Sequence, residues 1–128
     1  MIPAVFVTDF GPFPAVENDD YTAALEKLGK ELPKPKAIVV MSGHWEARGE
    51  TEVGAAKIPG ISHDYSGFPE SFYELKYPCP GDPVLAGEIV RLLLANGIKA
   101  KKDRERPLDH GAWVPLSRLY PDADIPVI

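Results

Sequence analysis

One apolar segment and the residues after it constrain the fold more than any other part of this chain. The run AIVVM at residues 37–41 leads directly into Ser42, Gly43 and His44. A short continuous apolar run rich in β-branched residues is typical of a strand buried in a parallel sheet. Polar residues that follow such strands gather at the carboxyl edge of the sheet, where open α/β folds bind ligands. We therefore interpret His44 as a candidate site residue at a strand end.

The N-terminal segment has the same layout. The run IPAVFVT at residues 2–8 predicts a strand buried on both faces, and Asp9 is the polar residue at its end. A histidine and a carboxylate at two strand ends would suit a first-row metal such as Fe(II). The sequence alone favours a different role for Asp9, that of capping the loop before Gly11. Two donors do not complete a metal site, so a third ligand would have to come from elsewhere.

Helix signals separate the strand signals. Asp19 or Asp20 is expected to cap a helix over residues 21–32, because small polar acceptors favour that position and apolar residues then recur at helical spacing. Asp82 followed by Pro83 predicts the start of another helix, since proline is favoured at the first helical position.

The remaining pattern predicts short strands within residues 51–58 and 98–102 and a short helix within residues 108–120, with Pro115 near its first turn. The apolar end at residues 125–128 should pair with another segment. Alternating strands and helices indicate an α/β fold with a mainly parallel sheet flanked by helices, in one domain over residues 1–128. The Pro-, Gly- and aromatic-rich stretch at residues 59–83 predicts a binding loop folded over a pocket.

Composition narrows the class of partner. The 128 residues are 45% hydrophobic and carry a net charge of -5, which disfavours nucleic acid and anionic membranes. A lone cysteine, Cys79, cannot form an internal disulfide, so we expect a reducing cytoplasm. No apolar run approaches the ~20 residues that span a bilayer.

Two further histidines could carry chemistry. His63 is followed by Asp64, and His110 is preceded by Asp109. An imidazole titrates near neutral pH and is suited to moving protons. Capping or surface roles are the alternative for each histidine. Phosphate-loop, nucleophile-elbow and structural-zinc patterns are not found in the sequence.

Three long segments, residues 31–49, 61–86 and 108–128, together resemble the class III extradiol ring-cleavage dioxygenases. Within that superfamily they are closest to the DOPA 4,5-dioxygenase group. The resemblance implies a doubly wound α/β fold, incomplete here, that holds a non-haem Fe(II), sometimes observed as Zn(II). It implies an extradiol dioxygenase-like protein that opens the ring of a catecholic aromatic with O₂.

The resemblance also assigns roles to residues. It implies that His44, in the family's "HW" pair, is a metal ligand and that His110, in "DHG", is the acid/base. His63, in "HD", would help to bind substrate. Asp9 stands where the family has a metal-binding histidine, and a carboxylate there would still bind Fe(II) with a changed charge and a shorter reach.

The resemblance covers the N-terminal half of such proteins, so we expect either a complementing C-terminal chain or a homo-oligomer that pairs through an exposed strand at residues 125–128. One alternative is a non-catalytic or partner-dependent metal-binding subunit of the same fold. Another is a zinc-dependent hydrolytic activity on the same scaffold.

Overall fold

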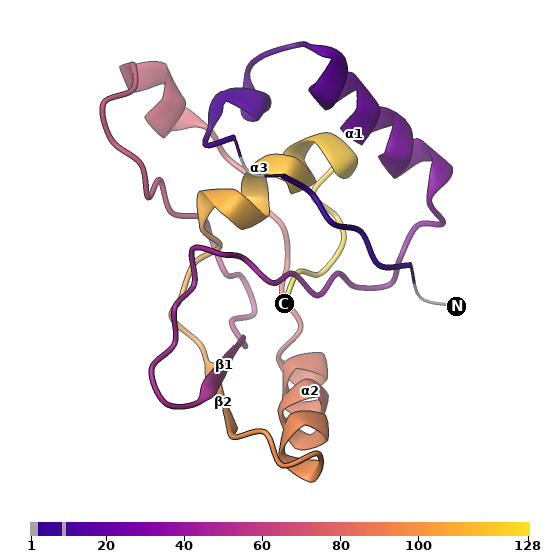
Figure 1. The fold of residues 1–128 in the computed structure, drawn as a ribbon, viewed down its shortest axis with the longest axis vertical. Helices are drawn as coiled ribbons and strands as arrows, with labels where there is room; N and C mark the ends of the chain where they lie inside the picture. Colours follow the sequence, from indigo (N-terminus) through magenta and orange to yellow (C-terminus); the bar gives the residue numbers. More distant parts are fainter. Residues whose placement is uncertain (1–2, 9) are drawn as a thin grey trace.

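The computed structural model describes residues 3–8 and 10–128. Asp9, one of the predicted metal ligands, therefore lies outside the described residues. The elements follow in the order η1 (Phe13–Ala15), α1 (Asp20–Glu31), β1 (Thr51–Gly54), η2 (Glu70–Glu74), α2 (Pro83–Ala95), β2 (Ala100–Asp103) and α3 (His110–Leu119) (Figure 1).

Helix α1 begins where its capping signal predicts. The Asp19 carboxylate accepts from the backbone N–H of Thr22 at 2.8 Å, and the Thr22 hydroxyl oxygen accepts from the N–H of Asp19 at 2.9 Å. The helix packs against α3 through Gly29. A Cβ at this glycine would lie 1.9 Å from the carbonyl oxygen of Leu119, so the two backbones approach too closely for any side chain.

Helix α2 connects the two paired strands. Asp82 accepts from the N–H groups of Val84 and Leu85, and Pro83 is the first helical residue, as predicted. Strands β1 and β2 pair in parallel, with Thr51 opposite Ala100. Helix α2 lies beside them as the crossover (Figure 1), which confirms the α/β class with a parallel sheet.

The segment at residues 37–41 pairs with the C-terminal segment. Its Ile38 donates to the carbonyl of Pro126 at 2.8 Å and accepts from the N–H of Ile128 at 2.9 Å, in a parallel bridge. The expectation that residues 125–128 pair with another segment is therefore confirmed. The expectation that they form an exposed edge is wrong, because Val127 and Ile128 are buried within this chain.

The apolar run at the N-terminus behaves differently from its prediction. Residues 3–8 form no strand, and Phe6 is 97% exposed. Val39 and Met41 are exposed too, so the segment at 37–41 is not covered on every side. An apolar pattern indicates that a segment can be buried. It does not identify the distant segment of the chain with which that segment would pair.

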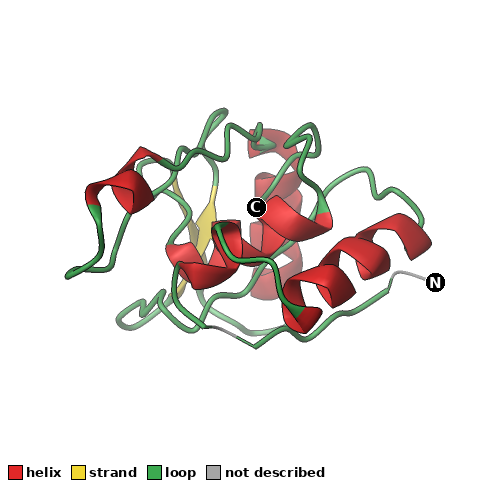
Figure 2. Ribbon diagram, turned by 90° about the horizontal axis from the view of Figure 1, so that it is seen from above, coloured by secondary structure: helices red, strands yellow, loops and turns green. Residues whose placement is uncertain are grey.

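Within the described residues, two groups of buried side chains form the core. The larger one surrounds α3 and includes Trp113 and Val114, and the smaller one joins α2 to β1 through Ala86 and Val53. Most residues of α3 are buried, and Figure 2 shows the helices (red) gathered around the short strands (yellow) and the loops. Pro115 lies in its second turn instead of near the first. None of the helices in the described part of the chain has the length and apolar character needed to cross a membrane.

Candidate metal and proton-transfer site

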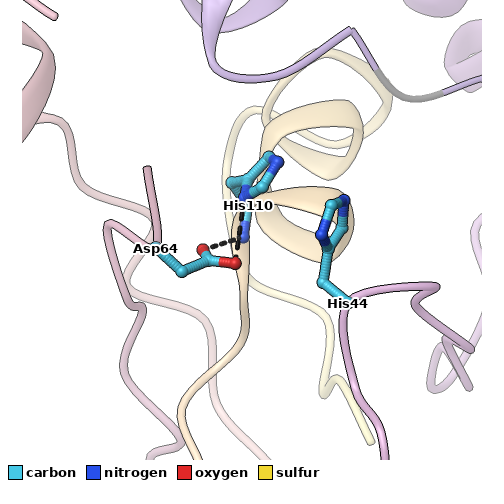
Figure 3. A group of neighbouring side chains, drawn as sticks. All are labelled: His44, Asp64 and His110. Carbon is cyan, nitrogen blue, oxygen red and sulfur yellow. Dashed lines mark hydrogen bonds and ion pairs between the residues drawn. The ribbon is translucent and has the colours of Figure 1, made fainter. Parts of the chain in front are cut away.

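Three side chains from distant parts of the sequence meet at the first turn of α3. His44 follows the segment at 37–41, Asp64 lies between β1 and η2, and His110 is the first residue of α3. One ligand atom from each of them lies within 4.8 Å of the other two. Figure 3 shows His44 and Asp64 on either side of His110.

His110 is held by Asp64 at two points. Its backbone N–H donates to Oδ1 of Asp64 at 2.8 Å, and its Nδ1 lies 3.0 Å from Oδ2 of the same carboxylate (Figure 3). The His110 side chain is only 8% exposed. The His110 ring is therefore buried and lies beside the Asp64 carboxylate.

The pKa of Asp64 reflects this arrangement. Partial burial by itself raises the pKa of the carboxyl group, but the hydrogen bonds from the backbone and ring of His110 outweigh it and lower the pKa below its ordinary value. Asp64 is therefore an ionised acceptor at neutral pH.

His44 stands against the other side of His110. Their ring centroids are 4.2 Å apart at an interplanar angle of 44°. The His44 backbone N–H donates to the Ser42 hydroxyl at 3.2 Å, and that hydroxyl donates to Oδ1 of Asp109 at 2.5 Å. Because Asp109 is also the N-cap of α3, this chain of hydrogen bonds ties the His44 loop to the start of that helix.

Arg106 fixes the same loop from a second direction. Its guanidinium donates to the backbone carbonyl of His44 at 3.1 Å and lies 5.0 Å from the ring centroid of Trp45. It also stands 3.7 Å from the buried carboxylate of Asp109. His44 is exposed to solvent, yet its backbone is bound on both sides.

His63, another predicted site residue, lies outside this group of three. Nε2 of His63 contacts the carbonyl oxygen of Leu75 at 3.0 Å, and the His63 ring packs against the rings of Tyr65, Tyr73 and Trp113. The predicted substrate-binding role of His63 is untested by these contacts and stays a prediction. The metal-binding role of Asp9 also stays a prediction.

Asp64 is the site residue that sequence reasoning missed. Its position beside His63 and the position of Asp109 beside His110 were both visible in the sequence. The pairing is crossed in the structure, because Asp64 contacts His110 while Asp109 caps α3 and binds Ser42. Only the tertiary fold determines which aspartate serves which histidine.

The donors present fit a divalent metal. Two imidazoles and one carboxylate are the set that non-haem Fe(II) sites use, and Zn(II) accepts the same donors. The aromatic rings of the loop at 59–83 pack next to this group, with Tyr65 5.7 Å from His110 between ring centroids. The site therefore combines potential metal ligands, a held histidine and an apolar aromatic wall.

Comparison with known proteins decides the family. Residues 3–128 match the family described as the catalytic LigB subunit of aromatic ring-opening dioxygenase. The chain belongs to this family. The match runs through all three segments on which the resemblance to extradiol dioxygenases rests.

Individual relatives agree with the family match. A 4,5-DOPA dioxygenase extradiol of Escherichia coli K12 is 44% identical over 99% of this chain, and one of Beta vulgaris is 50% identical over 73% of it. The crystal structure of an uncharacterized protein from Escherichia coli K12 superposes with a TM-score of 0.66 at 41% identity, covering 88% of this chain and 40% of that one. This chain spans 46% of the first relative and 35% of the second, so about half or less of their length.

Proposed function

We propose that this LigB-family chain carries an extradiol ring-opening site that acts on a catecholic aromatic and O₂ with a non-haem Fe(II). The observation that carries the proposal is the meeting of His44, Asp64 and His110 at the start of α3. Support for the substrate class comes from the relatives, which are named as 4,5-DOPA dioxygenases. Zn(II) is the alternative metal, because the same donors bind it.

In this proposal the residues divide into a binding side and a proton-transfer side. His44 is a metal ligand, and Asp9 is proposed as a second. A ferrous ion held there would supply the chelation of the catechol oxygens and the activation of O₂. His110 accepts a proton from the substrate hydroxyl and returns it later in the reaction, and His63 contributes to substrate binding.

A second ligand arrangement uses the three residues differently. If His44, Asp64 and His110 all bound the metal, they would form a two-histidine, one-carboxylate set. His110 would then be unable to exchange protons. The two arrangements predict different effects of His110→Ala on metal affinity. The affinity should change little if His110 is the acid/base, and metal binding should be almost completely lost if His110 is a ligand.

The proposed function is tested by an anaerobic Fe(II) titration in which calorimetry measures the binding. We expect about one Fe(II) per chain, loss of that binding in His44→Ala, and retention in His63→Ala as the matched histidine control. Oxygen uptake with catechols by the Fe(II)-loaded protein would then measure ring opening. Undiminished Fe(II) binding in His44→Ala would contradict the ligand assignment.

A non-catalytic or partner-dependent metal-binding subunit is the second candidate function. It is favoured by one observation, that the chain spans 46% of a curated relative. Under this proposal oxygen uptake requires a complementing chain that corresponds to the rest of such a relative, or a second copy of this chain. Uptake measured with and without that partner, beside light scattering, separates the two functions. A reducing cytoplasm remains our proposal for its location, supported by the lone Cys79.

A further inference from the structure

We propose that the outward face of α2 is an interface between two copies of this chain. The outward face is defined by Val84, Glu88, Arg91 and Ala95. The two copies of α2 pack antiparallel about a two-fold axis, so that Glu88 of one copy meets Arg91 of the other. This inference goes beyond the proposed function and does not depend on the metal site.

Helix α2 is apolar on more than the side that packs within the chain. It lies against β1 and β2, which Figure 1 shows on one side of it, and Ala86 is its one fully buried residue within the described chain. Val84 is 75% exposed, Leu92 60% and Leu94 53%. A helix that is apolar on most of its surface is normally covered on more than one side. The outer side of α2 therefore has the composition of an interface.

The spacing of the outward face suits lengthwise helix packing. Its four residues are separated by four, three and four positions, which places them in one line along the helix. All four are exposed, whereas Ala86 lies on the opposite side of the helix and joins the smaller core group. Alternating steps of four and three form the seam along which two helices pack side by side.

Charge complementarity selects a second copy of this chain as the occupant. Glu88 and Arg91 are the two charged residues of α2, and neither forms an ion pair with another described residue. The midpoint between Glu88 and Arg91 is also the midpoint between Val84 and Ala95. A two-fold axis at this point brings each Glu88 to Arg91 of the other copy and each Val84 to Ala95 of the other copy. The face is therefore complementary to itself when antiparallel.

The charge and size of the face indicate a weak, reversible dimer. Each chain carries a net charge of -5, but the outward face has one charge of each sign and adds no repulsion of its own. A helix of 13 residues is about 20 Å long. Two such helices bury less than the roughly 1,600 Å² of a standard protein interface. We therefore expect dimers that dissociate at micromolar concentrations.

Sedimentation velocity over a range of protein concentrations tests the proposal with two single variants. Arg91→Glu sets two glutamates against each other at both contacts, and Glu88→Arg sets two arginines against each other. Each variant should raise the dissociation constant of the dimer by about tenfold or more. Lys30→Glu is the matched control, because it makes the same charge change at an exposed position of α1 and should leave dimerisation unchanged. Circular dichroism checks that every variant is folded.

Mixing the two single variants gives the decisive reading. In an equimolar mixture of Arg91→Glu and Glu88→Arg, both contacts again join opposite charges, so a mixed dimer should form although neither variant dimerises well alone. A mixture that stays monomeric overturns the proposed arrangement.

Two other results would also overturn the proposal. A wild type that is monomeric at every concentration leaves the face of α2 to a different partner, and a dimer that is unchanged in both single variants has its interface elsewhere. The measurement needs neither metal nor catechol. Its failure would leave the proposed function untouched, and a lack of oxygen uptake would leave the dimer untouched.

Discussion

At the scale of single residues, the position of His44 depends on Gly111, which has no side chain. A Cβ at Gly111 would lie 2.7 Å from Cδ2 of His44 and 2.8 Å from the Ser42 hydroxyl. Only glycine allows the His44 loop to lie directly on the first turn of α3. This contact, together with the bonds from Arg106, explains how a solvent-exposed loop can present a well-placed ligand.

Gly111→Ala should therefore displace His44 without unfolding the protein. We expect Fe(II) affinity to fall by roughly 10-fold or more, as for other changes in the support of a metal ligand, while the unfolding midpoint changes little because alanine favours the helix. Gly43→Ala is the matched control, because its added Cβ meets nothing within 4 Å. Equal affinities of the two variants would argue against the close packing of His44 on α3.

The Asp103 carboxylate should give the stability of the protein a defined dependence on pH. Asp103 accepts from the N–H groups of Glu105 and Arg106, and these hydrogen bonds lower its pKa below the ordinary value of 3.8. A lowered folded-state pKa adds stability above the unfolded-state pKa, and this stability is lost as the pH falls through the folded-state pKa. The charge of Asp103 thus stabilises the protein at neutral pH.

We expect Asp103→Asn to be less stable than the wild type at pH 6 and nearly equal to it near pH 2.5. Solvent screening of this partly exposed group keeps the difference at pH 6 below about 1 kcal/mol. Urea unfolding at both pH values measures it, and the other acids cancel because both proteins contain them. A gap that widens on acidification would reverse the assigned sign.

At the scale of elements, the close packing of α1 against α3 requires glycine at residue 29. Gly29 of α1 faces the backbone of Leu119, with a virtual Cβ 1.9 Å from its carbonyl oxygen. Backbone cannot move aside as a flexible side chain can. The two helices can approach this closely only because residue 29 has no side chain.

Gly29→Ala should lower the free energy of unfolding by about 2 kcal/mol or more, because overpacking forces the helices apart. Gly87→Ala in α2 is the control, since its Cβ would meet only the flexible end of Lys102 at 2.8 Å. There the gain in helix propensity should stabilise the protein by up to about 1 kcal/mol. Thermal unfolding of both variants tests the contrast, which would vanish if α1 and α3 did not pack at Gly29.

The elements also show which features a sequence can reveal. The starts of α1 and α2 were predictable, because Asp19 and Asp82 act on backbone groups two or three residues away. Strand partners were not, since residues 3–8 have the same apolar pattern as 37–41 but make no bridge, while the predicted strand at 37–41 is reduced to one isolated bridge at Ile38. His44 and His110 were recognisable from their motifs, whereas the contact of Asp64 with His110 depends on tertiary folding.

At the scale of the whole molecule, stability depends on the buried C-terminal segment. Ile125 is 2% exposed, although its sequence neighbours Asp124 and Pro126 are less buried. The residues that follow Ile125 pair with the segment at 37–41, through the bridge between Val127 and Ile38. Removing the Ile125 side chain would open a cavity in the interior.

We expect Ile125→Ala to lower the free energy of unfolding by about 2–5 kcal/mol. Ile58→Ala is the matched control, because Ile58 is 74% exposed and should change stability by less than about 0.5 kcal/mol. Denaturant unfolding compares the two variants directly when the free energy of unfolding of both falls with denaturant concentration at the same slope. Similar losses in both variants would show that the C-terminal segment is not part of the core.

The pairing of Ile38 with Val127 has a kinetic consequence. Residues far apart in the sequence must meet before these backbone hydrogen bonds form, and closing such a long loop costs chain entropy before any contact compensates for it. The helices and their caps can form earlier, because their bonds are local. Folding should therefore end with the joining of these two segments, and the loop that carries His44 will reach its final place only in that last step.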